Sequence, residues 1–129
     1  MEVNKSTRYL TKVLVYLGLS PKMTGYKYVR ETILINIEKD CLKMHDVYTA
    51  AGQIYGKYPK IIESSIRNTL KQANNNGLGK RLDCLMGVSN FNNGYNITVS
   101  EFLGLMSDYM KHCWDGESFD LPELKPQSR

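Results

Sequence analysis

The chain has 129 residues, 42% of them hydrophobic and 23% charged, and this composition excludes a disordered or collagen-like protein. A chain of this length can bury about two thirds of its unfolded surface, so it suits one domain with one core. No stretch approaches the roughly 20 apolar residues that span a bilayer, and the N-terminus has no apolar secretion signal. Since the three cysteines cannot all pair, we expect a cytoplasmic protein that does not enter a membrane.

The formal net charge of +4 is unevenly distributed along the chain. Residues 114–129 contain four acidic and two basic residues, a net charge of −2, which leaves +6 for the rest of the chain. A basic body with an acidic tail fits a polyanionic partner. A solvated basic surface that binds nothing would give the same charge, so both interpretations stay open.

The first two helices are predicted over about residues 7–17 and 26–39. In the first segment apolar residues recur at the i, i+3, i+4, i+7 spacing of one helical face, and in the second they lie on one side with charged residues on the other. The core-facing residues are expected to be Leu10, Val13, Leu14 and Leu17 in the first helix, and Val29, Ile33, Leu34 and Ile37 in the second.

Two further helices are predicted over about residues 46–55 and 59–74. Pro59 suits the first turn of the fourth helix, where its missing N–H would have no intrahelical partner. The sequence NNNGLG, residues 74–79, should end that helix because Asn and Gly tolerate the left-handed backbone of a helix terminus. Its inner face should consist of Ile62, Ile66, Leu70 and Ala73.

A short fifth helix is predicted over about residues 80–86. The polar segment that follows, VSNFNNGYNI, is expected to be a loop. A hairpin that turns at Asn93-Gly94 is the alternative.

The sixth helix should begin at Thr98 and end near His112. Thr98 and Glu101 have the spacing of a capping box, in which a hydroxyl and a carboxylate each accept a hydrogen bond from a free backbone N–H. The buried residues should be Phe102, Leu105, Met106 and Tyr109. The sequence thus predicts an all-α, single-domain bundle of about six helices over residues 1–113.

Residues 114–129 show no periodicity and contain Pro122 and Pro126, so we expect an acidic, disordered tail. One hypothesis is that this tail screens the basic face of the domain.

Residues 50–67, AAGQIYGKYPKIIESSIR, join the third and fourth helices very tightly. A helix-turn-helix needs a small residue where the two helices meet and a turn former four residues later, and Gly52 and Gly56 have this spacing. Ile62 and Ile66 would face inward, with the small Ser65 near the crossing. An ordinary helical hairpin with a basic solvent face would show the same pattern, so the pattern alone does not decide between the two.

The longer order of motifs is more specific. The block GL-x-P-x-x-x-GY-x-Y-x-R-E, residues 18–31, the helix-turn-helix segment and the late SEF, residues 100–102, follow one another along the chain. Over about residues 9–111 the chain resembles the C-terminal DNA-binding effector domain of the sporulation initiation response regulator of endospore-forming bacteria, the stage zero sporulation protein A family.

The resemblance implies six helices whose recognition helix, residues 59–74, enters the major groove, often as a tandem homodimer on repeated promoter boxes. It implies that Glu63 and Arg67 face the bases. Ile61 and Ser64 stand where the family has arginines. Either the target sequence differs from the family's, or specific binding has been lost. Only about eight residues precede the resemblance, so we expect a stand-alone effector domain without a receiver domain.

The predicted function is sequence-specific binding of double-stranded DNA by a transcription regulator. The alternative is a protein-interaction module that keeps the fold, has lost base reading and modulates a full-length regulator. The residues expected to contact the DNA backbone are Lys57, Tyr58, Lys60 and Lys71. Those expected to read bases are Glu63, Ser64, Arg67 and Asn68.

We expect no metal, cofactor, small-molecule substrate or enzymatic activity. Cys41 and His45, and the adjacent His112 and Cys113, lack the convergent spacing of a tetrahedral zinc site. The sequence contains no catalytic nucleophile signature and no phosphate-binding glycine loop.

Overall fold

The computed structural model describes residues 4–39, 43–92 and 96–124, and within these ranges the regular structure is entirely helical. The α-helices are α1 (Lys5–Tyr16), α2 (Tyr26–Glu38), α3 (Met44–Tyr55), α4 (Pro59–Asn75), α5 (Leu78–Met86) and α6 (Val99–Asp108). A π-helical segment, η1 (Tyr109–Cys113), continues α6. The predicted all-α fold of six helices is confirmed. The Asn93-Gly94 turn, on which the alternative prediction of a hairpin depends, lies outside the described residues.

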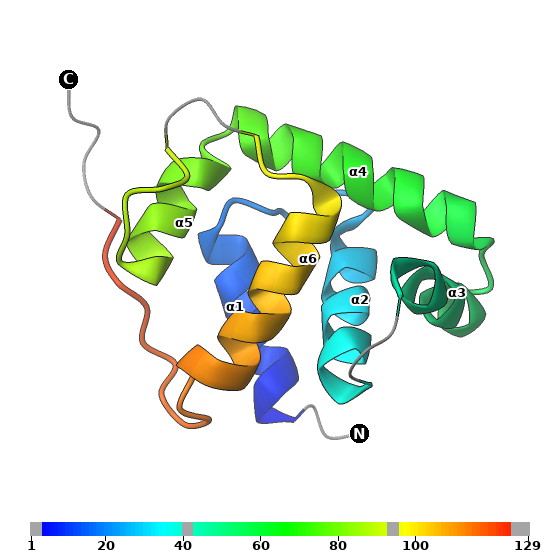
Figure 1. Ribbon diagram of the computed structural model, residues 1–129, viewed down its shortest axis with the longest axis horizontal. Coiled ribbons are helices and arrows are strands. Elements are labelled where there is room, and N and C mark those ends of the chain that lie inside the picture. The colour runs from blue at the N-terminus through cyan, green and yellow to red at the C-terminus, as the bar shows by residue number, and fades with distance from the viewer. Residues whose placement is uncertain (1–3, 40–42, 93–95, 125–129) are drawn as a thin grey trace.

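The central element is α2, which contacts α1, α3, α4 and α6 (Figure 1). Val29 and Ile33 are fully buried, as predicted. The buried side is broader than predicted and turned from the predicted face, because Tyr28 and Thr32 are also buried. Leu34 and Ile37, which were predicted to face the core, are only half-buried. The hydroxyl of Thr32 is satisfied locally, since it donates to the carbonyl of Tyr28 at 2.8 Å. Neighbouring helices on several sides therefore cover more of α2 than its amphipathic pattern suggests.

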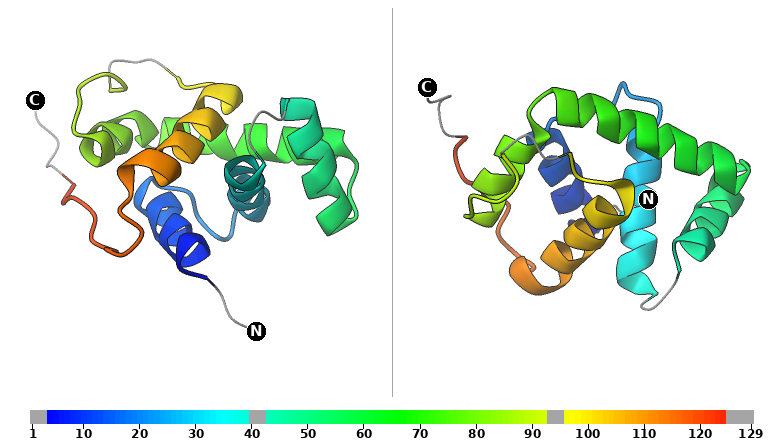
Figure 2. Two further views of the ribbon diagram at one scale, coloured as in Figure 1. Left: turned by 60° about the horizontal axis from the view of Figure 1, so that its bottom comes forward. Right: turned by 45° about the horizontal axis from the view of Figure 1, so that its top comes forward.

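The longest helix, α4, crosses one side of the molecule, with α3 at one end and α5 at the other (Figures 1 and 2). Its predicted inner face is confirmed as buried, and consists of Ile62, Ile66, Leu70 and Ala73. Near its C-terminus, the side-chain amide of Asn74 donates to the carbonyl of Ile97 at 3.3 Å. The opposite side of α4 is left to solvent.

Gly25, the N-cap of α2, lies directly against the backbone of α4. A Cβ at this position would lie 2.4 Å from the carbonyl oxygen of Ser65 and 2.4 Å from the hydroxyl of Thr69. The backbone N–H of Gly25 also donates to that hydroxyl at 3.1 Å. The two helices can approach this closely only because position 25 has no side chain.

The fifth helix begins two residues earlier than predicted, at Leu78. Gly77 has φ +94°, the left-handed conformation expected of a terminator, but Gly79 lies inside α5. A Cβ on Gly79 would lie 2.1 Å from the carbonyl oxygen of Phe91. This glycine therefore serves a close approach between α5 and the following loop, rather than helix termination.

The capping box at the start of α6 is confirmed. The backbone N–H of Glu101 donates to the hydroxyl of Thr98 at 3.2 Å, and the backbone N–H of Thr98 donates to the Glu101 carboxylate at 3.0 Å. Phe102, Met106 and Tyr109 are buried as predicted, whereas Leu105 is only half-buried. Helical structure continues to Cys113, one residue beyond the predicted end, although its last turn is π-helical.

Residues 114–119, part of the tail for which the sequence predicts disorder, lie against α1. The ring of Trp114 stacks on Tyr9 with centroids 4.5 Å apart, and Phe119 meets Tyr9 edge-on at 5.8 Å. Glu117 pairs with Lys5 at 2.7 Å. Single aromatic residues anchor this segment without forming a helix, so periodicity could not detect them.

The hypothesis that the tail screens the basic face of α4 does not hold for its described part. The charged contact of this part, between Glu117 and Lys5, is with α1.

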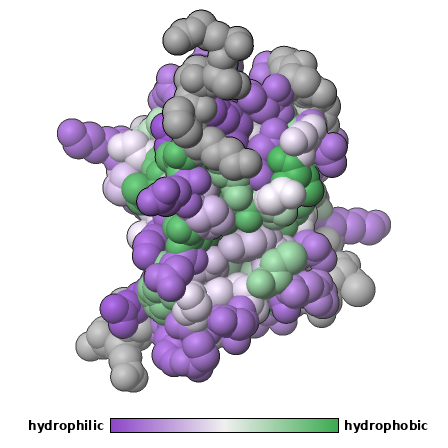
Figure 3. Space-filling view, turned by 90° about the vertical axis from the view of Figure 1, so that its left-hand side faces the viewer, coloured by the Kyte–Doolittle hydropathy of each residue, from purple (hydrophilic) through white to green (hydrophobic). Residues whose placement is uncertain are grey.

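On the face formed by α5 and this C-terminal segment, hydrophobic residues lie in small patches among hydrophilic ones (Figure 3). Of the described helices, none combines the length and the apolar character that crossing a bilayer requires.

We expect Gly52→Ala and Gly104→Ala to change stability in opposite directions. A Cβ on Gly52 would lie 2.3 Å from the carbonyl oxygen of Lys57, so the free energy of unfolding should fall by about 1–3 kcal/mol. Gly104 lies in α6 with open space around its Cβ position, so alanine there should add about 0.5–1 kcal/mol. Denaturant unfolding would measure both changes, and shifts in the same direction would contradict this account.

We also expect stability to fall above about pH 10. The buried hydroxyls of Tyr9 and Tyr109 lie 2.7 Å apart. Burial raises the pKa of both groups. They stay protonated in the folded protein while they ionise in the unfolded chain, so their contribution is present at neutral pH and lost as pH rises past about 10.

The loss should approach about 1.4 kcal/mol per pH unit for each tyrosine that stays protonated. Urea unfolding from pH 7 to 11 would measure it, with the double variant Tyr9→Phe/Tyr109→Phe as comparison. The same loss in the double variant would show that these two hydroxyls are not responsible.

Candidate nucleic-acid interface

The turn between α3 and α4 is built from glycine and proline. Gly56 ends α3 with φ +66°, and the backbone N–H of Lys57 donates to the carbonyl of Gly52 at 2.9 Å. The backbone of Lys57 thus lies on Gly52, where a side chain would collide with it. Pro59 then begins α4. The small residue is needed at position 52 because the turn folds back onto α3.

The structure brings all eight residues of the predicted site to this turn and to the solvent side of α4. Exposed are Lys57, Tyr58, Lys60, Arg67, Asn68 and Lys71, and half-buried are Glu63 and Ser64. Tyr58 is the most exposed of the large hydrophobic residues, at 81%. Four cations therefore face solvent over this region against one carboxylate, Glu63.

Glu63 and Arg67, the two residues that the resemblance places at the bases, contact each other. A guanidinium nitrogen of Arg67 donates to the Glu63 carboxylate at 2.9 Å, one helical turn away. An exposed pair of this kind stabilises a helix by only about 0.3–0.5 kcal/mol. It holds Arg67 in place in the free protein, yet it can exchange for a contact to DNA at little energetic cost.

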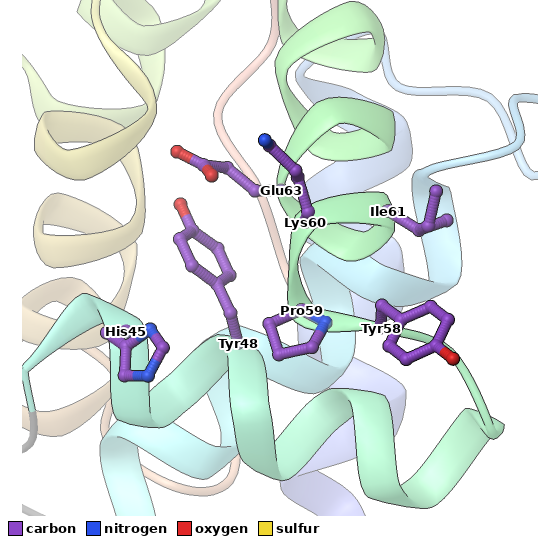
Figure 4. A pocket seen from close by; sticks show the side chains of 7 residues that line it. All are labelled: His45, Tyr48, Tyr58, Pro59, Lys60, Ile61 and Glu63. Atoms are coloured by element: carbon purple, nitrogen blue, oxygen red, sulfur yellow. The ribbon is translucent and has the colours of Figure 1, made fainter.

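An open hollow of about 590 Å³ lies beside the start of α4. Figure 4 shows that His45 and Tyr48 of α3 form one wall, and that the hydroxyl end of Tyr48 points toward Glu63. Burial raises the pKa of Tyr48, and the Glu63 carboxylate raises it further, while Arg67 lowers it. The Tyr48 hydroxyl is thus kept protonated and able to donate.

His45 and Tyr48 lie beside the candidate site, although the sequence pattern did not predict them there. Tyr48 is one helical turn before Gly52 on the buried side of α3, so the spacing to Gly52 could have placed it near α4. Nothing in the sequence pairs it with Glu63 specifically. That proximity depends on how the two helices cross.

A second hollow lies farther along α4, where the start of α6 approaches it. Arg67 and Lys71 line this hollow together with Asn96 and Ser100. It is therefore more polar than the first hollow, which Tyr58, Pro59 and Ile61 border. Along α4, the surface changes from partly apolar at the N-terminus to basic and amide-rich toward the C-terminus.

Among the residues that the structure describes, no group of three or more His, Cys, Asp or Glu side chains could hold a metal ion. Cys41 lies outside them.

Two helices joined at a glycine turn, the second of them exposed and basic, have the arrangement of the helix-turn-helix class of DNA-binding domains. A family model described as "Sporulation initiation factor Spo0A C terminal" matches residues 10–110. The chain belongs to this family of DNA-binding regulatory domains. No solved structure matches it significantly.

Proposed function

We propose that this protein regulates transcription by binding a specific sequence in double-stranded DNA, with α4 in the major groove. The observation that carries the proposal is the solvent side of α4 and its preceding turn, where Lys57, Lys60, Arg67 and Lys71 are exposed. Phosphates attract such a surface whatever the sequence, so this charge supplies affinity and orientation.

The dimensions of α4 fit this arrangement. Its 17 residues extend about 25 Å at 1.5 Å per residue, and the major groove, about 12 Å wide, admits one helix. Recognition helices contact base edges mainly with their N-terminal residues. Glu63, Ser64 and Arg67 lie in that half of α4, and Asn68 follows them.

The roles follow from the chemistry of the side chains. Lys57, Lys60 and Lys71 neutralise phosphates, and the exposed phenol of Tyr58 donates to one at the start of α4. Arg67 can contact guanine with two hydrogen bonds, and Asn68 can contact adenine in the same way. Glu63 accepts from cytosine or keeps Arg67 oriented.

Selection of bound sequences from a random duplex library, at a defined low salt concentration, tests the proposal. We expect one enriched motif, and a repeat of that motif at fixed spacing would indicate two copies bound in tandem. Affinity too weak to measure for every duplex would overturn the proposal. Such a result, together with co-purification of a receiver-bearing homologue, would favour the protein-interaction module, to which the exposed apolar side chains of Tyr58 and Ile61 are also suited.

Arg67→Ala and Lys71→Ala should affect binding differently. Loss of Arg67 should cost about 1–3 kcal/mol on the selected site and flatten the preference among bases at one position. Loss of Lys71 should weaken all duplexes alike and reduce the salt slope by about one unit. Titrations of selected and scrambled duplexes over a range of salt would measure both, and the same pattern in the two variants would contradict the assigned roles.

A further inference from the structure

Ile61 is an aliphatic side chain on the solvent side of α4, and packing does not account for its place there. It is 47% exposed, while Ile62, the next residue along, is fully buried. The part of the Ile61 side chain that stays in water gains nothing from the fold, because an aliphatic group is stabilised by leaving water. A partner that covers Ile61 would supply that gain.

The position of Ile61 on the helix is that of a base-contacting residue. It lies in the first turn of α4, and Ser64 and Asn68 follow it three and seven residues later, in one row along the helix. Figure 4 shows Ile61 on the same side of the start of α4 as Tyr58, and turned away from Glu63. Ile61 and the Glu63–Arg67 pair thus lie at the two edges of the solvent face of α4, with Ser64 and Asn68 between them.

The charges around Ile61 favour nucleic acid over a protein surface as its partner. Lys60 precedes it directly, Lys57 lies in the turn, and both are exposed. The cores of protein interfaces are depleted of charged residues, whereas a row of bases in the major groove is flanked by phosphates on both sides. An apolar contact within a basic rim matches the second arrangement.

One base presents an apolar group in the major groove. Adenine, guanine and cytosine offer hydrogen-bonding atoms at that edge, and thymine adds a C5 methyl group that aliphatic side chains contact. We infer that Ile61 contacts the methyl group of a thymine and so makes this protein prefer thymine at one position of its site. The inference rests on the proposed function, and it assigns Ile61 a specificity that an arginine there could not have.

The test uses the duplex that the selection enriches and replaces its thymines by deoxyuridine one at a time, which removes one methyl group and keeps the hydrogen bonds. Wild-type protein should lose about fourfold in affinity at one position, the loss expected when a single methyl group stays in water. Ile61→Ala should bind thymine and uracil at that position equally well. The matched control is Val15→Ala, because Val15 on α1 is 49% exposed and should keep the full methyl effect.

Three outcomes would overturn the inference, and they separate its failure from that of the proposed function. The inference is wrong, although specific DNA binding is still supported, if an enriched motif binds equally well without any of its thymine methyl groups. The same holds if the methyl effect persists in Ile61→Ala. Weaker binding of Ile61→Ala to every duplex alike, with less self-association of the protein, would assign Ile61 to a contact between two copies. A selection that enriches no motif would remove both.

Discussion

The backbone of α2 begins directly against the backbone of α4 at Gly25, and the placement of the exposed helix depends on this contact. A Cβ at position 25 would lie 2.4 Å from the carbonyl oxygen of Ser65, so no other residue fits without separating the two helices. Gly52 sets a second close approach, because the carbonyl of Lys57 lies where its side chain would be. One glycine thus fixes α4 against the central helix, and the other fixes it at the turn. These two close approaches place α4 with its inner face buried and its other side exposed to solvent.

Two surfaces of the protein each carry several cations, α1 and the solvent side of α4, and the described part of the C-terminal segment contacts those of α1. On α1, Lys5 pairs with Glu117, Arg8 lies over the ring of Phe119, and Lys12 donates to the carbonyl of Phe119. These three cations of α1 therefore contact the C-terminal segment. In the described part of the chain, the cations of α4 have no such cover, and the ion pair on this helix is the internal one between Glu63 and Arg67. The described part of the acidic segment therefore leaves the basic surface of α4 uncovered.

Sequence patterns predicted the helices and their buried faces well, because both depend on neighbours along the chain. The inner face of α4 and the Thr98–Glu101 capping box needed only helical spacing and local hydrogen bonding. The sequence patterns failed where a residue contacts a segment that is distant along the chain. The segment NNNGLG does end α4 as predicted, but its last glycine lies inside α5, and the close approach of Phe91 to Gly79 was not predicted. The aromatic anchor at Trp114 was missed because its partner, Tyr9, lies at the other end of the chain.

The same distinction holds for the candidate site, where some features follow from the sequence and others depend on how the helices pack. The residue types on the solvent side of α4, their spacing and the departure at Ile61 are properties of the sequence alone, because an α-helix of known register places them. The tertiary structure decided that Glu63 and Arg67 pair, that Tyr48 stands beside Glu63, and that the start of α6 borders the far end of α4. The first set follows from the 3.6-residue period of one helix. The second set depends on the angles and distances at which separate helices pack. Gly25 and Gly52 allow two of these close approaches because they have no side chain.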